Sequence, residues 1–239
     1  MIDHRPFASL GSAQHGWLDA KHHFSFADYH DPARLHWGAL RVWNDDTIAP
    51  GGGFPLHPHA NMEIITYVRE GAITHQDSLG NKGRTEAGDV QVMSAGSGIR
   101  HSEYNLEPGI TRIFQIWIVP AETGGAPSWG TQAFPKGLHS GQWVVLASGF
   151  ADEAATALPI RTPARVLGAS LRAGQTLRHD FADPTRVGYL VPACGQLEVN
   201  GLRLDCGDGA AIQAEAHLQI LALQDAELVL VDAAGPAQR

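Results

Sequence analysis

Two short triplets of metal-binding residue types constrain the fold of this chain more than any other feature of its sequence. They read His57-Pro58-His59 and His101-Ser102-Glu103. In a β-strand, side chains alternate between the two faces, so residues i and i+2 point the same way, roughly 7 Å apart along the backbone. Each triplet therefore presents two donor groups on one face of a strand. If the two strands face each other, three imidazoles and one carboxylate converge.

The converging donors match a divalent transition metal. Imidazole suits iron, copper, nickel and zinc, and a carboxylate adds a hard anionic oxygen. Structural zinc sites are more often closed, tetrahedral and rich in cysteine, whereas four donors leave positions of an octahedral ion open to a substrate. A lone histidine is usually structural, but two donor pairs in one short region favour the metal interpretation. We therefore predict one divalent metal held by His57, His59, His101 and Glu103.

The rest of the first half is a series of short strand patterns separated by turns. Low charge (18 %) and a high content of glycine (27 residues) and proline (14 residues) suit a β-rich fold with tight loops. Pro58 cannot donate a ladder hydrogen bond, so its strand is predicted to be an edge strand or to be bulged. Strands this short predict an antiparallel barrel or sandwich. The predicted strands cover residues 38–49, 62–69, 72–77, 90–94, 99–105 and 110–120.

The second half repeats the pattern of the first without its donors. Strand, turn, strand and a Gly-Asp pair recur, and the positions that match His57 and His59 are Phe181 and Asp183. His179 and His217 are therefore interpreted as structural. Residues 120–141, rich in proline and glycine, are a candidate linker. We predict an all-β, two-domain protein, with a metal-binding barrel over residues 1–140 and a metal-free barrel over residues 141–239.

The composition argues against a nucleic-acid-binding protein and against a membrane protein. A net charge of −8 argues against direct nucleic-acid binding, which needs a basic face. No apolar run approaches the ~20 residues of a membrane span, and the N-terminal residues lack the apolar core of a signal peptide. Cys194 and Cys206 are interpreted as reduced thiols, with a disulfide between them the less favoured alternative. We expect a cytoplasmic protein, a monomer rather than an oligomer.

Histidines also crowd the first 36 residues, with aromatic residues between them. Their spacing is irregular, which favours a segment packed over a barrel, with the imidazoles in ordinary hydrogen bonds. They are His4, His15, His22, His23, His30 and His36.

Several segments resemble the cupin superfamily and, within it, the pirins. The pattern Gly51-x5-His57-x-His59-x3-Glu63 resembles the first cupin motif, and residues 88–103 resemble the second. The AGSGIRHSE stretch has two extra residues before its histidine, a form typical of pirins. HGWLDAKHHFSFADY, RVWNDD, HQDSLGNKG and FQIWIVP are also similar to bacterial pirin-like proteins, which include quercetin 2,3-dioxygenases. The resemblance is dense over residues 14–120.

The resemblance implies two cupin-type antiparallel β-barrels with the metal in the first. In the pirin pattern the carboxylate ligand is Glu103, whereas many cupins use a glutamate near the position of Glu63. Glu63 is therefore either a close neighbour of the ligands or a residue that faces solvent or caps a loop. The barrel lining is expected to be apolar with few polar groups, through Ile64, Thr66, Val92, Phe114 and Ile116.

The implied function is a metal-dependent dioxygenase that opens the heterocycle of a flavonol such as quercetin with loss of carbon monoxide. Fe(II) is the leading metal, with Zn, Cu, Ni, Mn and Co as alternatives, and Glu103 also relays the substrate proton. A second hypothesis is an iron-dependent, redox-sensing regulatory protein that acts through protein partners. A third is a metal-bound isomerase or small-molecule binder, because cupins host many chemistries.

Overall fold

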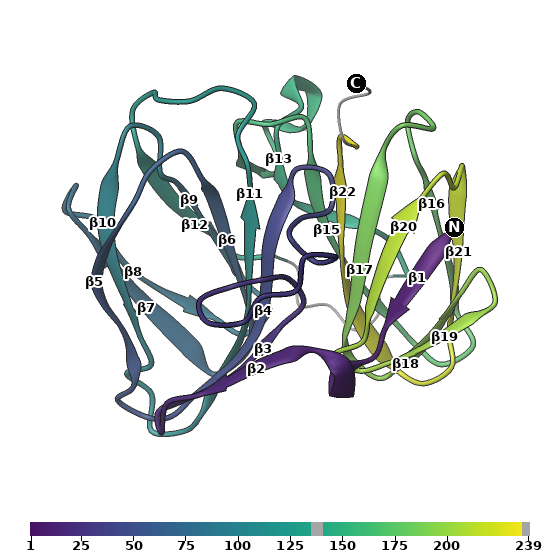
Figure 1. The fold of residues 1–239 in the computed structure, drawn as a ribbon, viewed down its shortest axis with the longest axis horizontal. Helices are drawn as coiled ribbons and strands as arrows, with labels where there is room; N and C mark the ends of the chain where they lie inside the picture. The colour runs from purple at the N-terminus through teal and green to yellow at the C-terminus, as the bar shows by residue number, and fades with distance from the viewer. Residues whose placement is uncertain (135–140, 236–239) are drawn as a thin grey trace.

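Alternating side chains and closely spaced turns make this chain a succession of short β-strands, most of them antiparallel (Figure 1). The computed structural model describes residues 1–134 and 141–235. The strands form two cupin-type domains, each with one seven-stranded and one four-stranded sheet. Helical structure in the described residues comprises two short 3₁₀ turns, η1 (Phe7–Ser9) and η2 (Ala151–Glu153). Across the described residues, no helix is long and apolar enough to span a membrane.

The N-terminal domain places its smaller sheet on the outside, at the left of Figure 1. The small sheet has the order β5 (Gly53–His59), β10 (Ile99–Tyr104), β7 (Ala72–Asp77) and β8 (Lys82–Glu86). The large sheet has the order β12 (Ser128–Gln132), β9 (Val90–Ser94), β6 (Glu63–Glu70), β11 (Thr111–Ile118), β4 (Leu40–Ile48), β3 (Leu18–His22) and β2 (Gly11–Gln14).

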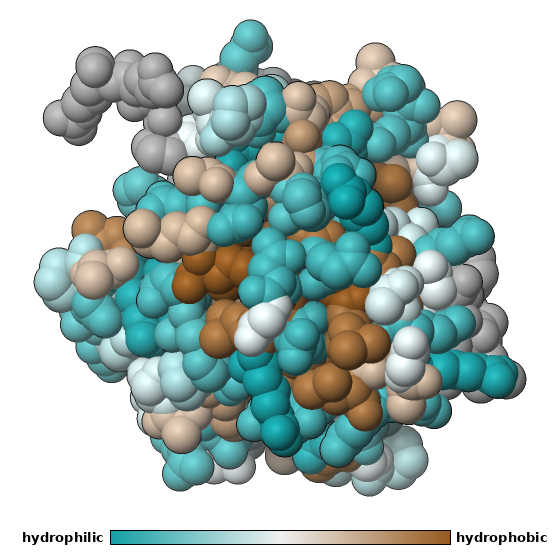
Figure 2. Space-filling view, turned by 90° about the vertical axis from the view of Figure 1, so that its right-hand side faces the viewer, coloured by the Kyte–Doolittle hydropathy of each residue, from teal (hydrophilic) through white to brown (hydrophobic). Residues whose placement is uncertain are grey.

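The C-terminal domain repeats this layout. Its small sheet has the order β16 (Thr176–Asp180), β21 (His217–Ala222), β18 (Gln196–Val199) and β19 (Leu202–Asp205). Figure 2 looks at this domain from outside and shows polar residues interleaved with apolar ones. The large sheet has the order β1 (Ile2–Arg5), β20 (Gly209–Gln213), β17 (Val187–Cys194), β22 (Ala226–Ala233), β15 (Arg165–Leu171), β13 (Val144–Ser148) and β14 (Leu158–Pro159).

The first strand lies in the domain of the other half of the chain. β1 pairs antiparallel with β20, with Ile2 opposite Ile212. It covers an edge of the C-terminal sheet that would otherwise present unpaired backbone groups. The predicted assignment of residues 1–140 to one domain therefore differs from the structure at this strand. The boundary predicted after residue 140 falls beside residues 135–140, which lie outside the described residues.

The two large sheets pack face to face and share one hydrophobic core. Trp43 of β4 is fully buried there, with ring centroids 5.3 Å from Phe114 and 5.6 Å from Tyr189. Ile65 and Tyr67 of β6 point into the same core. The domain interface is therefore part of the protein's interior.

This interface corrects the predicted barrel lining. Ile64 and Thr66 face the inside of the N-terminal barrel, as predicted, since Ile64 packs with Met93 and Thr66 bonds to Glu103. Val92, Phe114 and Ile116 instead belong to the core between the domains. The prediction for these three was wrong because both faces of the large sheet are buried, so burial does not distinguish the barrel interior from the domain interface.

The interiors of the two barrels differ in polarity. The small sheet and large sheet of the C-terminal domain close over leucine-rich packing that includes Leu190, Leu197 and Leu218, all fully buried. The N-terminal barrel instead encloses polar residues, among them Gln91 and Gln115. An apolar, filled interior suits a supporting domain, whereas buried polar groups need partners and mark a site.

The predicted strands match β4, β6, β7, β9, β10 and β11, with ends that differ by a few residues. Five strands of the first half were missed, namely β1, β2, β3, β8 and β12. β8 pairs with β7, and β12 lies inside the predicted linker, where it pairs with β9. The linker prediction was therefore wrong for residues 128–132, because an edge strand with few apolar residues leaves little periodic signal.

Replacing Trp43 with alanine is expected to lower the free energy of unfolding by about 3–5 kcal/mol, since the cavity forms in the shared core of both domains. Urea denaturation followed by circular dichroism measures the change. Trp143→Ala is the control, because Trp143 is only partly buried and lies away from the interface core. A loss no larger than that of the control would contradict the importance of the interface.

Candidate metal centre

β5 and β10 bring the two donor triplets side by side. They pair antiparallel with His101 directly opposite His57. β5 is an edge strand of the small sheet, as Pro58 predicted. A register shift between His101 and Glu103 interrupts the regular pairing, and beyond it Glu103 lies opposite Phe54 of β5.

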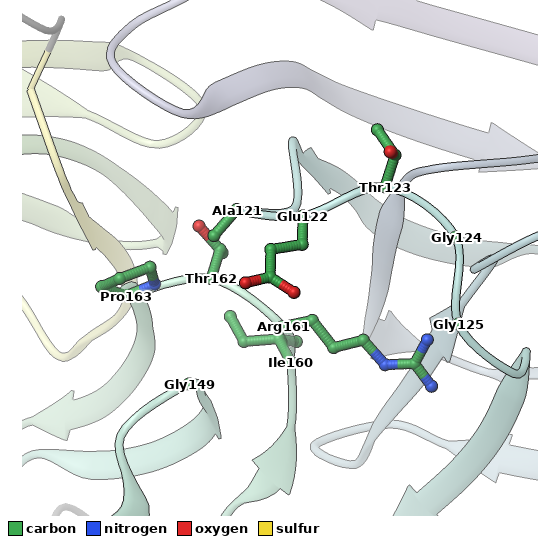
Figure 3. A pocket seen from close by; sticks show the side chains of 10 residues that line it. All are labelled: Ala121, Glu122, Thr123, Gly124, Gly125, Gly149, Ile160, Arg161, Thr162 and Pro163. Atoms are coloured by element: carbon green, nitrogen blue, oxygen red, sulfur yellow. The ribbon is translucent and has the colours of Figure 1, made fainter.

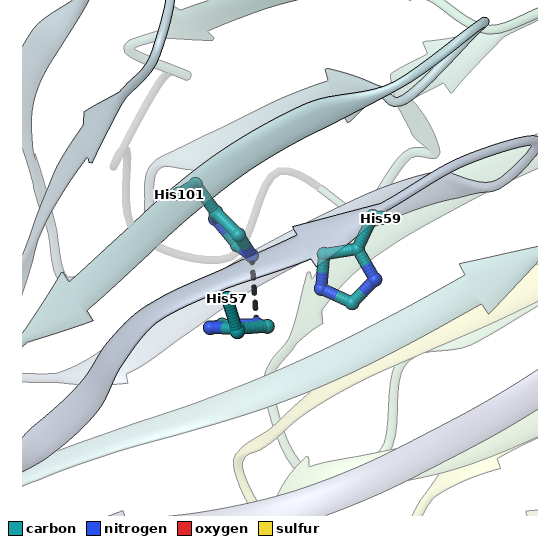
Figure 4. Close-up of side chains that lie close together, drawn as sticks. All are labelled: His57, His59 and His101. Atoms are coloured by element: carbon teal, nitrogen blue, oxygen red, sulfur yellow. Dashed lines mark hydrogen bonds between the residues drawn. The ribbon is translucent and has the colours of Figure 1, made fainter.

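Three imidazoles converge inside the mouth of the N-terminal barrel (Figure 4). The Nε2 atoms of His57 and His101 lie 3.1 Å apart. One ring nitrogen from each of His57, His59 and His101 lies within 4.8 Å of the other two, a grouping that could hold a metal ion. The structure therefore brings together three of the four residues predicted as ligands.

The hydrogen bonds around these rings leave two ring nitrogens, His57 Nε2 and His59 Nε2, available to bind a cation. His57 Nδ1 lies 2.7 Å from the carbonyl oxygen of Pro55, which can only accept, so Nδ1 carries the proton and Nε2 is bare. His59 Nε2 is buried and has no hydrogen-bond partner among the described residues. A divalent metal would satisfy both nitrogens, so the donor set fits the predicted ion.

Two of the three imidazoles, those of His59 and His101, are held neutral, the form that binds metals. Burial lowers the pKa of His59 to about 4, with His57 contributing in the same direction. Burial and then the neighbouring His57, His59 and His75 lower the pKa of His101 to about 2. Ligand histidines must be deprotonated before they bind, so this environment favours metal binding.

Glu103 lies on the other side of His101. It is grouped with His75 and His101, whose donor atoms also lie within 4.8 Å of one another, rather than with His57 and His59. Burial raises the pKa of Glu103 to about 7, and hydrogen bonds from Thr66, Gln91 and Gln115 oppose that rise. Its role as a fourth ligand stays a prediction.

Two glutamine amides clamp the Glu103 carboxylate. Gln91 Nε2 donates to Oε1 at 2.5 Å, and Gln115 Nε2 donates to Oε2 at 2.9 Å. The amide oxygens are themselves fixed, because Gln91 Oε1 accepts from the Thr85 hydroxyl and Gln115 Oε1 accepts from the Trp117 indole. These bonds assign both amide orientations and stabilise the ionised form of Glu103.

A pocket opens beside His59 at the barrel rim. Its volume is about 460 Å³, and it is lined by Pro58, His59, Ala60, Ser78, Gly98, Ile99 and Arg100. A second pocket of about 450 Å³ lies at the junction of the domains, where Glu122 and Arg161 point into it (Figure 3). The rim pocket is the one that touches a predicted ligand.

Comparisons with known proteins identify the family of this chain. The family model described as Pirin matches residues 4–118, and the model described as Quercetinase C-terminal cupin domain matches residues 145–233. The chain is 70 % identical over 234 residues to a pirin-like protein of Caulobacter vibrioides, which covers 98 % of this chain and 100 % of that protein. This chain belongs to the pirin family.

The names of two further pirin relatives mention a reaction and a metal. A protein of Escherichia coli K12 named quercetin 2,3-dioxygenase is 41 % identical over 235 residues, covering 97 % of this chain and 98 % of that protein. The crystal structure of the bacterial pirin YhhW from Escherichia coli in complex with nickel(II) superposes with a TM-score of 0.91 at 39 % identity, covering 99 % and 100 % of the two chains.

Glu63 of this pirin-family chain lies away from the histidines. It is buried on β6, accepts a hydrogen bond from the Ser94 hydroxyl, and points toward the domain interface, where Arg161 also bonds to it. His57 and Glu63 are six residues apart and would share a face in one continuous strand, but the chain turns between β5 and β6, so their side chains face different ways. Neither prediction for Glu63 describes this position.

The other histidines follow the structural interpretation where the structure reports their bonds. His22 bonds to Asn44 and His23 to Tyr189, both through Nδ1. His179 Nε2 lies 3.2 Å from Asp232, and His217 is exposed on β21. Both cysteines are free. Metal-binding groups among the described residues are confined to the N-terminal barrel.

Sequence reasoning missed three buried residues around this pirin site. His75 carried a readable signal, because His75-Gln76-Asp77 repeats the spacing of the two ligand triplets on a strand that was correctly predicted. Gln91 and Gln115 carried none, since a glutamine on a strand is ordinarily exposed.

Proposed function

We propose that this chain is a metal-dependent dioxygenase that opens the heterocycle of a flavonol such as quercetin. The metal, Fe(II) in this proposal, would be held by His57, His59, His101 and Glu103. The observation that carries the proposal is the convergence of three imidazole ring nitrogens beside an open pocket. The Escherichia coli relative named quercetin 2,3-dioxygenase supports the choice of reaction.

A bound divalent metal would supply Lewis acidity and a template for substrate and dioxygen. The protein's own contribution is to place and deprotonate the substrate. Glu103 is buried beside His101, and one of its carboxylate oxygens would accept the flavonol 3-hydroxyl proton. Gln91 and Gln115 hold this carboxylate in place before and after the transfer.

The rim pocket suits a flat aromatic molecule. Pro58 and Ile99 give it apolar walls, and His59 is among the residues that line it. The Trp117 ring meets His59 edge-on with centroids 4.9 Å apart, which fixes the imidazole plane. Apolar walls with a few polar groups are the usual composition of a small-molecule site.

The test is consumption of dioxygen and of flavonol together. Purified protein loaded with iron, copper, nickel, manganese or cobalt, one at a time, is mixed with quercetin in an oxygen electrode while its absorbance is followed. We expect both to fall with at least one metal. If neither falls with any metal or related enol, the dioxygenase proposal fails and the redox-sensing regulatory hypothesis moves ahead. Protein partners, a cytoplasmic location and a monomeric state stay predictions.

A further inference from the structure

A third triplet, His75-Gln76-Asp77, lies directly behind the candidate metal centre. β7 pairs with β10, so that His101 is opposite Asp77 and Glu103 is opposite His75. His75 is fully buried, and its Nδ1 lies 3.4 Å from His101 Nδ1. His75 Nε2 lies 3.1 Å from Asp77 Oδ2. The three side chains form one chain of hydrogen bonds that ends at a predicted ligand.

Asp77 determines which atoms donate and which accept in these hydrogen bonds. Its Oδ1 accepts from the backbone N–H groups of Leu79 and Asn81 at 2.9 and 3.1 Å, and its Oδ2 accepts from Asn81 Nδ2 at 2.9 Å. These three donors, none of which involves His75, favour the ionised form of the Asp77 carboxylate. An ionised carboxylate has no proton to donate, so His75 Nε2 must be the donor in the bond between them.

The remaining protons follow by elimination. A neutral His75 with its proton on Nε2 offers a bare Nδ1 to His101. His101 Nδ1 must then carry a proton and donate it to His75. His101 Nε2 is left bare and faces His57 Nε2. This is the tautomer that can bind a metal through Nε2.

We propose that Asp77 and His75 are positioning residues that hold His101 in its Nδ1-protonated tautomer, with Nε2 ready for the metal. The proposal rests on the metal site of the proposed function. Residues that bond to the second nitrogen of a ligand histidine fix its tautomer and ring orientation, and their loss typically weakens metal binding by about 10- to 100-fold.

His75 is also fixed by packing. Its ring stacks on Trp129 with centroids 4.8 Å apart and planes 9° from parallel. Trp129 fits there because Gly83 has no side chain, as a Cβ on Gly83 would lie 2.2 Å from the indole ring. The hydrogen-bonded side chains of Asp77, His75 and His101 are therefore held on one face by β12 and at the Asp77 end by the turn after β7.

Asp77→Asn is the most direct test. Asparagine has nearly the shape of aspartate, but it can place an N–H donor opposite His75 Nε2 where aspartate has only an acceptor. The amide oxygen of the substituted side chain can still accept from the two backbone N–H groups, which directs its NH₂ group at His75 Nε2. His75 must then move its proton to Nδ1, and His101 must move its own to Nε2. An aspartate-to-asparagine change behind a catalytic histidine is known to produce the wrong tautomer in this way.

Two measurements follow the change in the full chain. Two-bond ¹⁵N–¹H correlation spectra of histidine-labelled, chelator-treated protein report the His101 tautomer, with the His101 signal identified by its absence in His101→Gln. Competition with a chromophoric chelator gives the affinity for Ni²⁺. We expect the Nδ1-protonated form in the unmodified protein, the Nε2-protonated form in Asp77→Asn, and Ni²⁺ binding about 10- to 100-fold weaker in the variant.

Asp208→Asn is the matched control. Asp208 also caps a turn and bonds to a histidine, since it accepts from the Phe7 and Asp205 backbone and lies 2.9 Å from His4 Nε2. It lies in the other domain and is expected to leave both readouts unchanged. If Asp77→Asn does not fold, His75→Asn and His75→Leu replace it. These side chains are similar in size, and only asparagine keeps an acceptor for His101.

The proposal is overturned if His101 carries its proton on Nε2 in the unmodified protein. It is also overturned if tautomer and Ni²⁺ affinity do not change together in Asp77→Asn, or if His75→Leu behaves like His75→Asn. Flavonol turnover enters neither measurement. A protein that shows the expected tautomers and affinities but consumes no flavonol would retain this inference and lose the proposed function.

Discussion

The His101→Ala protein is expected to purify largely free of metal, with affinity for a divalent ion at least about 100-fold below that of the unmodified protein. His101 is the residue on which both donor groups of the N-terminal barrel meet. The substitution removes one imidazole ligand. It also removes the side chain that links the group containing Glu103 to the group containing His57. His59→Ala should have a comparable effect, and elemental analysis after purification measures both.

The controls come from the other domain. His179→Ala and His217→Ala should keep one metal per chain, because His179 bonds to Asp232 and His217 is exposed. His179→Ala also tests whether loss of a buried histidine alone depletes metal. Full occupancy in His101→Ala, or two metals per chain in the unmodified protein, would contradict the assignment.

Glu103→Gln is expected to reduce flavonol turnover by about 100- to 10,000-fold while metal binding falls less. An amide oxygen can still coordinate a metal, but an amide does not accept the substrate proton. The new NH₂ group also faces a clamp of donors, since Gln91 and Gln115 both present N–H groups to residue 103. One of the two amides must turn over and give up its bond to Thr85 or Trp117.

Single-turnover absorbance measurements on metal-loaded protein give the rate, and elemental analysis gives occupancy. Glu63→Gln is the matched control, because Glu63 is a similarly buried carboxylate of the same domain that points toward the domain interface. It should retain turnover. Equal turnover in Glu103→Gln and the unmodified protein would remove Glu103 from the proton transfer.

The sequence predicts the strands and the convergence of the histidines because both depend on local rules. Alternation along β5 and β10 places His57 and His101 on facing sides, and the structure pairs them directly. The same rule failed for Phe114. Alternation predicts that Phe114 and Gln115 face opposite ways, but it does not predict which of the two faces the barrel interior. Both faces of this sheet are buried. The apolar Phe114 faces the other domain, and the polar Gln115 faces the inside of the barrel.

The surroundings of Glu103 were beyond local rules for a related reason. Its partners Thr66, Gln91 and Gln115 come from β6, β9 and β11, so the clamp exists only once the large sheet has formed. The sequence offers three unremarkable polar residues at separate places. His75 differs, because its spacing to Asp77 resembles the ligand triplets and could have been given weight before the structure was known.

The pairing of β1 with β20 has a consequence for the order in which the protein can be completed. Ile2–Arg5 leaves the ribosome long before its partner Gly209–Gln213 is made. Domains usually fold as they emerge, and contacts between distant residues form slowly because a long loop must close. The N-terminal barrel can therefore assemble around its histidines while the first strand waits unpaired. A substitution that weakens the pairing of Ile2–Arg5 with Gly209–Gln213 would hinder a late step of folding rather than the first.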